Sequence, residues 1–388
     1  ITEGLVGSEM CIRDSSFSEE QEEFRSFLRR FLEEKSPTTE VRRLMATDAG
    51  WEKEQWRKVN TELGLTAIAI PEEYGGQGFG LSEQCIVLEE MGRSLLCAPY
   101  FSSAVLTANA ILYGASEEYK KKYLPEIASG DLTASLAFTE ETGAWDISSM
   151  SMCAEKTENT YHLTGVKSFV LDGHMSDLII VLAKVNDNSG SQRLALFSVD
   201  STATGLTKNL LNSTDQTRKL AKLMFNDVEA TCISSEDNVT EAMQKTFLKS
   251  CIGLSNEMVG GAERLREDTL EYVKMRMQFG RSIASFQVTK HKATDMLADV
   301  ELAKSAAYYA AAAFDDGESD IAATASIAKA SASEAYMQTA INAVQMHGGI
   351  GFTWDNDTHL WFKRAKSSEV FLGTADFHRE LMMQSWDQ

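Results

Sequence analysis

The chain is poor in several features that would assign it to other classes of protein. Its 388 residues include only four prolines and no low-complexity stretch, so no linker between independent units is indicated. Lys and Arg number 37 against 57 Asp and Glu, which gives a formal net charge of -20. Neutralising nucleic-acid phosphates needs clustered basic residues in excess. The charge therefore argues against a nucleic-acid partner and favours an acidic enzyme or subunit.

Metal-binding and disulfide patterns are also missing. The six cysteines contain no C-x-x-C pair, and the six histidines contain no H-E-x-x-H spacing. Such spacings bring metal ligands together or mark a disulfide framework. We therefore predict no metal site and cysteines that are reduced. The cysteines are Cys11, Cys85, Cys97, Cys153, Cys232 and Cys251.

Long apolar runs are absent as well. No stretch approaches the roughly 20 residues that span a bilayer, and no basic segment followed by an apolar one marks a secretory signal. The expected location is the cytoplasm, with no membrane partner. Residues 1–15 follow neither a helical nor a strand period, look like an appended leader, and are left out of the fold prediction.

The spacing of apolar residues changes twice along the chain, from helical to strand-like and back to helical. Ser18 opens an S-E-E-Q capping box before an amphipathic helix, and short β-rich runs separated by polar turns begin near Leu132. After Asn238 the pattern returns to long helices, two of them rich in alanine (296–314 and 321–346). We expect an α+β fold with an N-terminal helical domain (16–131), a middle β-barrel-like domain (132–236) and a C-terminal four-helix bundle (237–388). Apolar faces left over on such a bundle suggest an oligomer.

A stretch near the C-terminus is the most informative part of the sequence. Met337, Ile341 and Val344 form an apolar stripe at helical spacing, and the pair Gly348 and Gly349 then ends the helix. Taken alone, two glycines after a helix are typical of a C-cap. The residues around them, Q-x-x-G-G-x-G-F from Gln345, then a basic helix and a G-T turn, resemble the C-terminal signature of the acyl-CoA dehydrogenase family of flavoproteins.

Further motifs carry the same resemblance, which extends from Phe17 to the C-terminus. RMQFGRSIASFQ (276–287) is similar to the family's R-x-x-F-G followed by glutamine, and AFTEETGAWD (137–146) with GVKSFV (165–170) is similar to its flavin-lining segments. The loop and helix at 71–93 look like the family's P-E-x-x-G-G-x-G segment. That loop also imitates a dinucleotide-binding turn, but its spacing is not G-x-G-x-x-G.

The resemblance implies FAD as cofactor and a set of contacts to it. Arginine supplies planar donors suited to a pyrophosphate, phenylalanine a flat surface and glutamine an amide. The first group would contact the FAD of a neighbouring subunit and close around its adenine half, and the second would contact the flavin. The first group is Arg276, Phe279, Gln287, Gln345, Gly348 and Gly349, and the second is Phe138, Thr139 and Phe169; Thr374 of the G-T turn is a further cofactor-binding candidate.

The base that the family needs is missing from its usual place. Members of the family remove the α-proton of an acyl-CoA thioester with a glutamate directly before G-T, and here that residue is Leu372, which has no lone pair. The alternative position, on the helix before R-x-x-F-G, falls on Ser250, and a serine without an activating partner is no substitute. Glu369 lies one helical turn from Leu372. The catalytic residue therefore stays unassigned.

Two more departures fall beside the flavin. Leu171 stands where the family has a threonine near N5, and Trp145 where it has the serine of G-S-D. Three readings follow: a dehydrogenase with an unrecognised base, a subunit of a heteromeric acyl-CoA dehydrogenase whose partner carries the glutamate, or a flavin enzyme of different chemistry. The second is favoured. By resemblance the substrate would be a fatty or steroid side-chain acyl-CoA, and the acceptor an electron-transfer flavoprotein.

Overall fold

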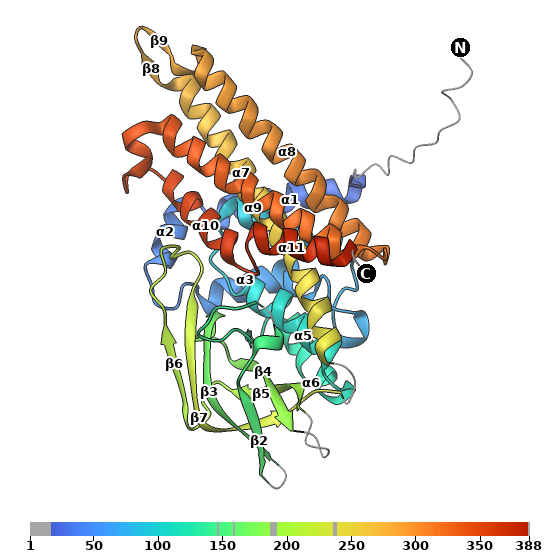
Figure 1. The fold of residues 1–388 in the computed structure, drawn as a ribbon. Coiled ribbons are helices and arrows are strands. Elements are labelled where there is room, and N and C mark those ends of the chain that lie inside the picture. Colours follow the sequence, from blue (N-terminus) through green and yellow to red (C-terminus); the bar gives the residue numbers. More distant parts are fainter. Residues whose placement is uncertain (1–16, 146, 158–159, 187–191, 236–238, 387–388) are drawn as a thin grey trace, which may run out of the picture.

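The chain folds into a helical region, a β region and a second helical region, in that order (Figure 1). The structure is a computed structural model and describes residues 17–145, 147–157, 160–186, 192–235 and 239–386. The expected leader, residues 1–15, lies outside the described residues. The α+β fold that the sequence predicts is confirmed.

The N-terminal region is a layer of helices around the buried helix α4. Ser18 caps α1 as predicted: its hydroxyl accepts from the Gln21 backbone N–H at 3.2 Å, and the Gln21 side-chain oxygen accepts from the Ser18 backbone N–H. An ion pair between Arg29 and Glu90, at 2.6 Å, holds α1 to α4. The helices are α1 (Glu19–Lys35), α2 (Thr38–Met45), α3 (Lys53–Leu63), α4 (Leu81–Ser94), the π-helical η3 (Phe101–Thr107), α5 (Ala108–Gly114) and α6 (Glu117–Ala128), with short 3-10 turns η1 (Leu65–Ala67) and η2 (Glu72–Tyr74).

The middle region is a seven-stranded sheet that closes on itself. Strand β5 pairs with both β4 and β7, which joins the two ends of the path β4-β2-β3-β7-β5. Strand β3 carries one extra residue against β7 between Lys167 and Val170, a bulge that re-aims the local side chains. The strands are β1 (Ala134–Ala137), β2 (Cys153–Thr157), β3 (Thr160–Leu171), β4 (Leu178–Asn186), β5 (Gln192–Asp200), β6 (Leu206–Leu210) and β7 (Leu220–Cys232).

The C-terminal region packs its helices around α9, which contacts α7, α8, α10 and α11. Helix α7 also crosses α4 very closely, because Gly92 and Gly260 lie at the crossing. A Cβ at either would lie 1.9 Å from a backbone carbonyl oxygen of the opposite helix. The elements are α7 (Val239–Met275), the hairpin β8 (Met277–Gln278) and β9 (Arg281–Ser282), η5 (Ile283–Ser285), α8 (Gln287–Asp315), α9 (Ile321–His347), η6 (Gly348–Phe352), α10 (Thr358–Val370) and α11 (Ala375–Trp386).

One apolar core runs from the N-terminal helices through the inner end of the barrel to the turn between α10 and α11. A second core fills the barrel. No helix in the described ranges is both long and apolar enough to cross a bilayer. Within the same ranges, no cluster of His, Cys, Asp and Glu could hold a metal ion.

Candidate functional site

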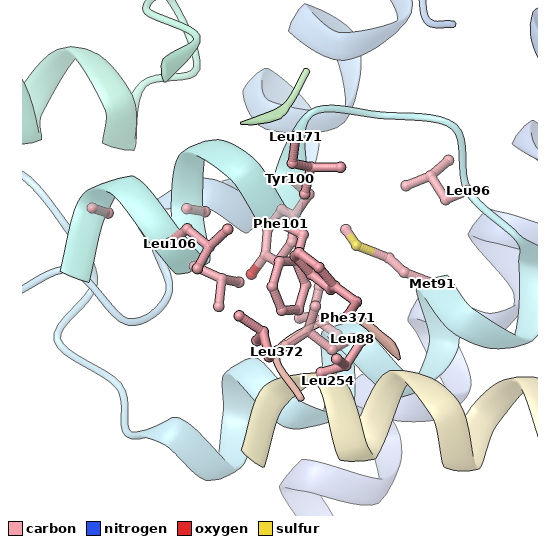
Figure 2. Packing of buried hydrophobic residues seen from close by; sticks show 14 of the residues in the cluster. Leu88, Met91, Leu96, Tyr100, Phe101, Leu106, Leu171, Leu254, Phe371 and Leu372 are labelled. Atoms are coloured by element: carbon pink, nitrogen blue, oxygen red, sulfur yellow. The ribbon is translucent and has the colours of Figure 1, made fainter. Parts of the chain in front are cut away.

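The turn that joins α10 to α11 has a strained backbone and an apolar side chain. Leu372 is in the left-handed region with φ 58°, and Gly373 follows with φ 105°. For a non-glycine residue this conformation costs roughly 1–2 kcal/mol. The Leu372 side chain is only 2% exposed and lies among Phe101, Leu254 and Phe371 (Figure 2). The side chain at the position predicted for the base therefore has no titratable group.

Two buried cationic or basic side chains hold this turn through its carbonyl oxygens. His378 Nε2 lies 2.8 Å from the Leu372 oxygen, and Lys329 Nζ donates to the Gly373 oxygen at 2.7 Å and to the Glu369 oxygen at 3.3 Å. Burial lowers the pKa of Lys329 to about 8. Burial, and then the charge of Lys329, lower the pKa of His378 to about 4. Both groups therefore bind the backbone of the turn and fix its shape.

The residues that could replace the missing base are engaged elsewhere. Ser250 is fully buried, and its hydroxyl donates to the Thr246 carbonyl at 2.7 Å within α7. The Glu369 carboxylate pairs with Lys366 at 2.5 Å. Neither geometry leaves an activated hydroxyl or a free carboxylate at the turn.

A second carboxylate, Glu257, lies two helical turns beyond Ser250 on α7. Its Oε1 accepts from Arg218 at 2.6 Å and from Arg364 at 2.7 Å, and the carboxylate is buried. Glu257 is thus already engaged by two guanidinium groups. Glu257, Arg218 and Arg364 therefore form a buried ion cluster.

Beside this cluster lies a cavity of about 40 Å³, lined on its apolar side by Leu88, Met91, Phe101 and Leu171. By the usual measure it holds about three water molecules. Asp172 borders it, accepts from the Ser102 hydroxyl at 2.7 Å, and has its pKa raised to about 6 by burial. A space of this size has no room for a long acyl chain.

A series of aromatic rings fills the region between the barrel and the turn. Phe138 contacts Phe247 and Trp145, with ring centres 4.9 and 5.8 Å apart, and Trp145 contacts Phe371 at 5.8 Å. Phe371 in turn contacts Phe101 at 5.6 Å. Trp145 is thus part of the packing that occupies this region.

The predicted flavin contacts on the barrel are only partly available to a ligand. The Thr139 hydroxyl donates to the Ser168 carbonyl at 2.5 Å, and Leu171 is 5% exposed. Phe169 lies in the β3 bulge with φ 59° and is 43% exposed. Only the Phe169 ring is presented to the outside.

The other predicted cofactor residues gather at the far end of the C-terminal helices, away from the barrel (Figure 1). Phe279, on the β8–β9 hairpin, is 91% exposed with φ 53°, and the exposed Arg276 forms no ion pair within the described ranges. A Cβ at Gly348 or Gly349 would meet nothing within 4 Å. The Tyr272 and His347 rings stack 4.2 Å apart and join the end of α7 to the end of α9. Exposed Gln287 and Gln345 belong to the same end, whereas exposed Thr374 lies at the α10–α11 turn.

Comparison with known proteins identifies the family. Three family models match, described as the acyl-CoA dehydrogenase N-terminal domain (residues 18–131), middle domain (135–228) and C-terminal domain (240–386). The acyl-CoA dehydrogenase IpdE2 of Mycobacterium tuberculosis is 30% identical over 89% of this chain and 91% of that protein. The chain belongs to the acyl-CoA dehydrogenase family.

Solved structures of acyl-CoA dehydrogenases have the same fold. Butyryl-CoA dehydrogenase from Megasphaera elsdenii aligns with a TM-score of 0.88 at 25% identity, over 96% of this chain and 99% of that chain. The ChsE4-ChsE5 complex from Mycobacterium tuberculosis aligns with a TM-score of 0.86 at 27% identity, over 97% and 99%. The family consists of oxidoreductases that act on acyl-CoA, and FAD is its cofactor.

The residues present fit FAD at the β8–β9 hairpin but not at the barrel. At the hairpin end, an unpaired guanidinium, an exposed ring and open glycines offer what a pyrophosphate and an adenine need. At the barrel end, the threonine hydroxyl is already bonded, the neighbouring position is leucine, and rings fill the adjoining space. The hairpin group of residues therefore fits the cofactor of the family, and the barrel group does not.

Sequence reasoning missed Lys329 and His378. Lys329 is a lone lysine within an alanine-rich stripe, and a charged residue at apolar spacing is the signal that could have marked it. No comparable signal marks His378.

Proposed function

We propose that this chain is the subunit without the catalytic base in a heteromeric acyl-CoA dehydrogenase. In the assembly, it lends the β8–β9 hairpin and η6 to an FAD whose flavin is held by a partner subunit that carries the glutamate. Bound FAD would supply a hydride acceptor for the β-hydrogen of the thioester, and the partner's carboxylate would take the α-proton. Electrons would then pass to an electron-transfer flavoprotein.

The observation that carries this proposal is the environment of Leu372. An enzyme of this family needs a carboxylate at the turn or an equivalent one nearby, and Ser250, Glu369 and Glu257 are all engaged in other bonds. The aromatic packing between Trp145 and Phe371 adds a steric argument, since it fills the region next to the turn. A chain built in this way is suited to support catalysis on another subunit.

The distribution of cofactor residues supports the same proposal. Arg276 and Phe279 project from the far end of α7, whereas Phe138 and Thr139 lie at the barrel (Figure 1). One FAD bound to one chain cannot use both groups. A second chain is required to complete either half, and the ChsE4-ChsE5 complex is a two-component relative of the same fold.

The test is a visible absorption spectrum of the chain, made alone and together with any glutamate-bearing acyl-CoA dehydrogenase that is encoded beside it. Each sample is titrated anaerobically with a panel of acyl-CoA thioesters. We expect little bound flavin in the chain alone, and about one FAD per pair of chains in the complex, bleached by substrate. The matched sample is the partner subunit alone.

Two results would contradict the proposal. Flavin that is bound and bleached by acyl-CoA in this chain alone would mean that the protein is a dehydrogenase with its own base. Flavin that is bound and unaffected by any thioester, but reoxidised by oxygen after reduction with a separate reductant, would indicate a flavin enzyme of different chemistry.

A further inference from the structure

The segment that follows β1 lies against both aromatic side chains that the sequence predicts as flavin contacts. A Cβ at Gly143 would lie 3.7 Å from Cε2 of Phe169, and the ring centre of Trp145 lies 5.8 Å from that of Phe138. Phe138 directly follows β1, whereas Phe169 belongs to β3. One short segment, residues 143–145, therefore contacts the barrel at the two places where the sequence predicts the flavin.

The Trp145 ring also fills the space between the barrel and the α10–α11 turn. Its centre lies 5.8 Å from that of Phe371, with the two planes at 77°, an edge-to-face contact. The cavity that remains beside it is only about 10 Å³ and is lined by Phe138, Ile147 and Met150 among others. Such a volume holds about one water molecule. No ring system of a ligand fits between Phe138 and Phe371 while the indole is there.

The bonds that fix the chain around this segment do not involve the indole. The Glu140 carboxylate accepts from the backbone N–H groups of Ser151 and Met152, at 3.0 and 2.9 Å. The same carboxylate pairs with buried Lys167 of β3 at 3.1 Å. We therefore expect the chain to keep its path when the Trp145 side chain is shortened.

The position of Trp145 at the surface also makes its truncation tolerable. Trp145 is half-buried, and its neighbours Thr142 and Ala144 are exposed. Large losses of stability on truncation come from sealed cavities in a core that cannot relax. A smaller residue at position 145 instead opens the space between the rings to solvent, and to a ligand that enters from solvent.

We propose that Trp145 is the residue that keeps this chain's own barrel from holding a flavin ring. The indole takes the place that a planar ligand needs, whereas the Phe169 ring, 43% exposed, is free to stack on such a ligand. The inference deepens the proposed function, on which it rests, because it names the side chain that makes this chain depend on a partner to hold the flavin.

Titration of the full chain with riboflavin, followed by the quenching of flavin fluorescence, tests the proposal. Riboflavin has the flavin ring but neither the pyrophosphate nor the adenine that the β8–β9 hairpin and η6 are proposed to bind. We expect Trp145→Ser to bind riboflavin about tenfold more tightly than wild type, as one added aromatic stacking contact gives. Equal binding by wild type and variant, or no binding by either, would overturn the proposal.

A matched variant separates exclusion by Trp145 from a general loosening of the aromatic packing. Phe247→Ala removes another ring that contacts Phe138, from α7, and should bind no more riboflavin than wild type. An equal gain in Phe247→Ala would overturn the assignment to Trp145. Circular dichroism establishes that Trp145→Ser is folded, and Trp145→Val provides the same comparison if it is not.

The riboflavin comparison can fail separately from the proposed function. If the folded Trp145→Ser variant binds no riboflavin, the inference fails, while a partner subunit can still hold the flavin. If this chain forms no flavin-binding complex with a glutamate-bearing subunit, the proposed function fails, while the comparison of wild type with Trp145→Ser still decides whether the indole excludes the ring.

Discussion

The imidazole Nε2 of His378 lies 2.8 Å from the carbonyl oxygen of Leu372, the residue at the position that the sequence predicts for the base. Since burial and the charge of Lys329 lower the His378 pKa to about 4, the ring is neutral at pH 7 and donates its Nε2 proton to that oxygen. The backbone of the turn is thereby fixed by a side chain six residues further along.

The pH dependence of stability should report this bond. The folded pKa of His378 lies below the roughly 6.5 of an unfolded histidine, so the folded chain binds fewer protons between these values. The stabilisation that the neutral His378 contributes is fully present above about pH 6.5 and is lost as the pH falls towards 4. Between pH 7.5 and pH 4.5, the free energy of unfolding of wild type should fall by on the order of 2 kcal/mol more than that of His378→Gln. Urea unfolding at the two pH values measures this difference. His291→Gln, at an exposed histidine, is the control, and an equal change there would contradict the assignment.

Placing a carboxylate at position 372 should destabilise the isolated chain. Leu372→Glu puts an ionisable group among apolar side chains, and burial raises its pKa. The variant should therefore lose about 3 kcal/mol at pH 8 against Leu372→Gln, with the gap opening as the pH rises above about 4.3. Unfolding of both variants at pH 5 and pH 8 measures it. If the difference in unfolding free energy between the two variants is the same at both pH values, the carboxylate is exposed to solvent in the folded variant.

Removing the Arg276 guanidinium should weaken FAD retention in the assembled oligomer. The guanidinium is exposed and unpaired in the described part of the chain, so it is available to a pyrophosphate. We expect Arg276→Ala to raise the dissociation constant for FAD about tenfold. Fluorescence of released flavin measures the change. Lys274→Ala removes the same charge from a residue that pairs with Glu271, and flavin content should not respond to it.

Replacing Lys329 should loosen the same turn from the other side. Lys329→Met keeps most of the volume but leaves the Gly373 and Glu369 carbonyls without a donor, for a loss of about 1–3 kcal/mol. Because the folded pKa of Lys329 is about 8, against about 10.4 when unfolded, wild type gains stability from this group as the pH rises between these values, and the variant does not. Guanidinium unfolding at pH 7.5 and 9.5 tests both parts. Lys366→Met, at an exposed lysine on α10, should leave stability within about 0.5 kcal/mol.

Much of the fold could be predicted because its signals are local. The capping box at Ser18 and the alanine-rich periods correspond to α1, α8 and α9, and the short β-rich runs correspond to strands of the barrel. These patterns depend on residues within one or two turns of each other. The pairing of β3 with β7 does not, because β4, β5 and β6 lie between these two strands in the chain.

The candidate site could be predicted only where a motif carried it. Motif spacing gave the positions of Leu372, Arg276 and Phe279 in the chain, but their cofactor roles remain predictions. The contact between Lys329 and the Gly373 carbonyl joins residues 44 positions apart, and the ring contact of Trp145 with Phe371 joins two domains. Such pairings depend on tertiary packing, which no sequence period records.

The exposed β8–β9 hairpin should also make unassembled copies of the chain sensitive to proteolysis. Lys274, Arg276 and Arg281 follow one another on an exposed projection, and segments of that kind are preferred sites of proteolytic nicking. A trypsin-like protease would cut a free copy there, and a partner seated on the hairpin would shield it. The segment that is proposed to complete a neighbour's cofactor site would then also be the segment at which an unassembled copy is most open to cleavage.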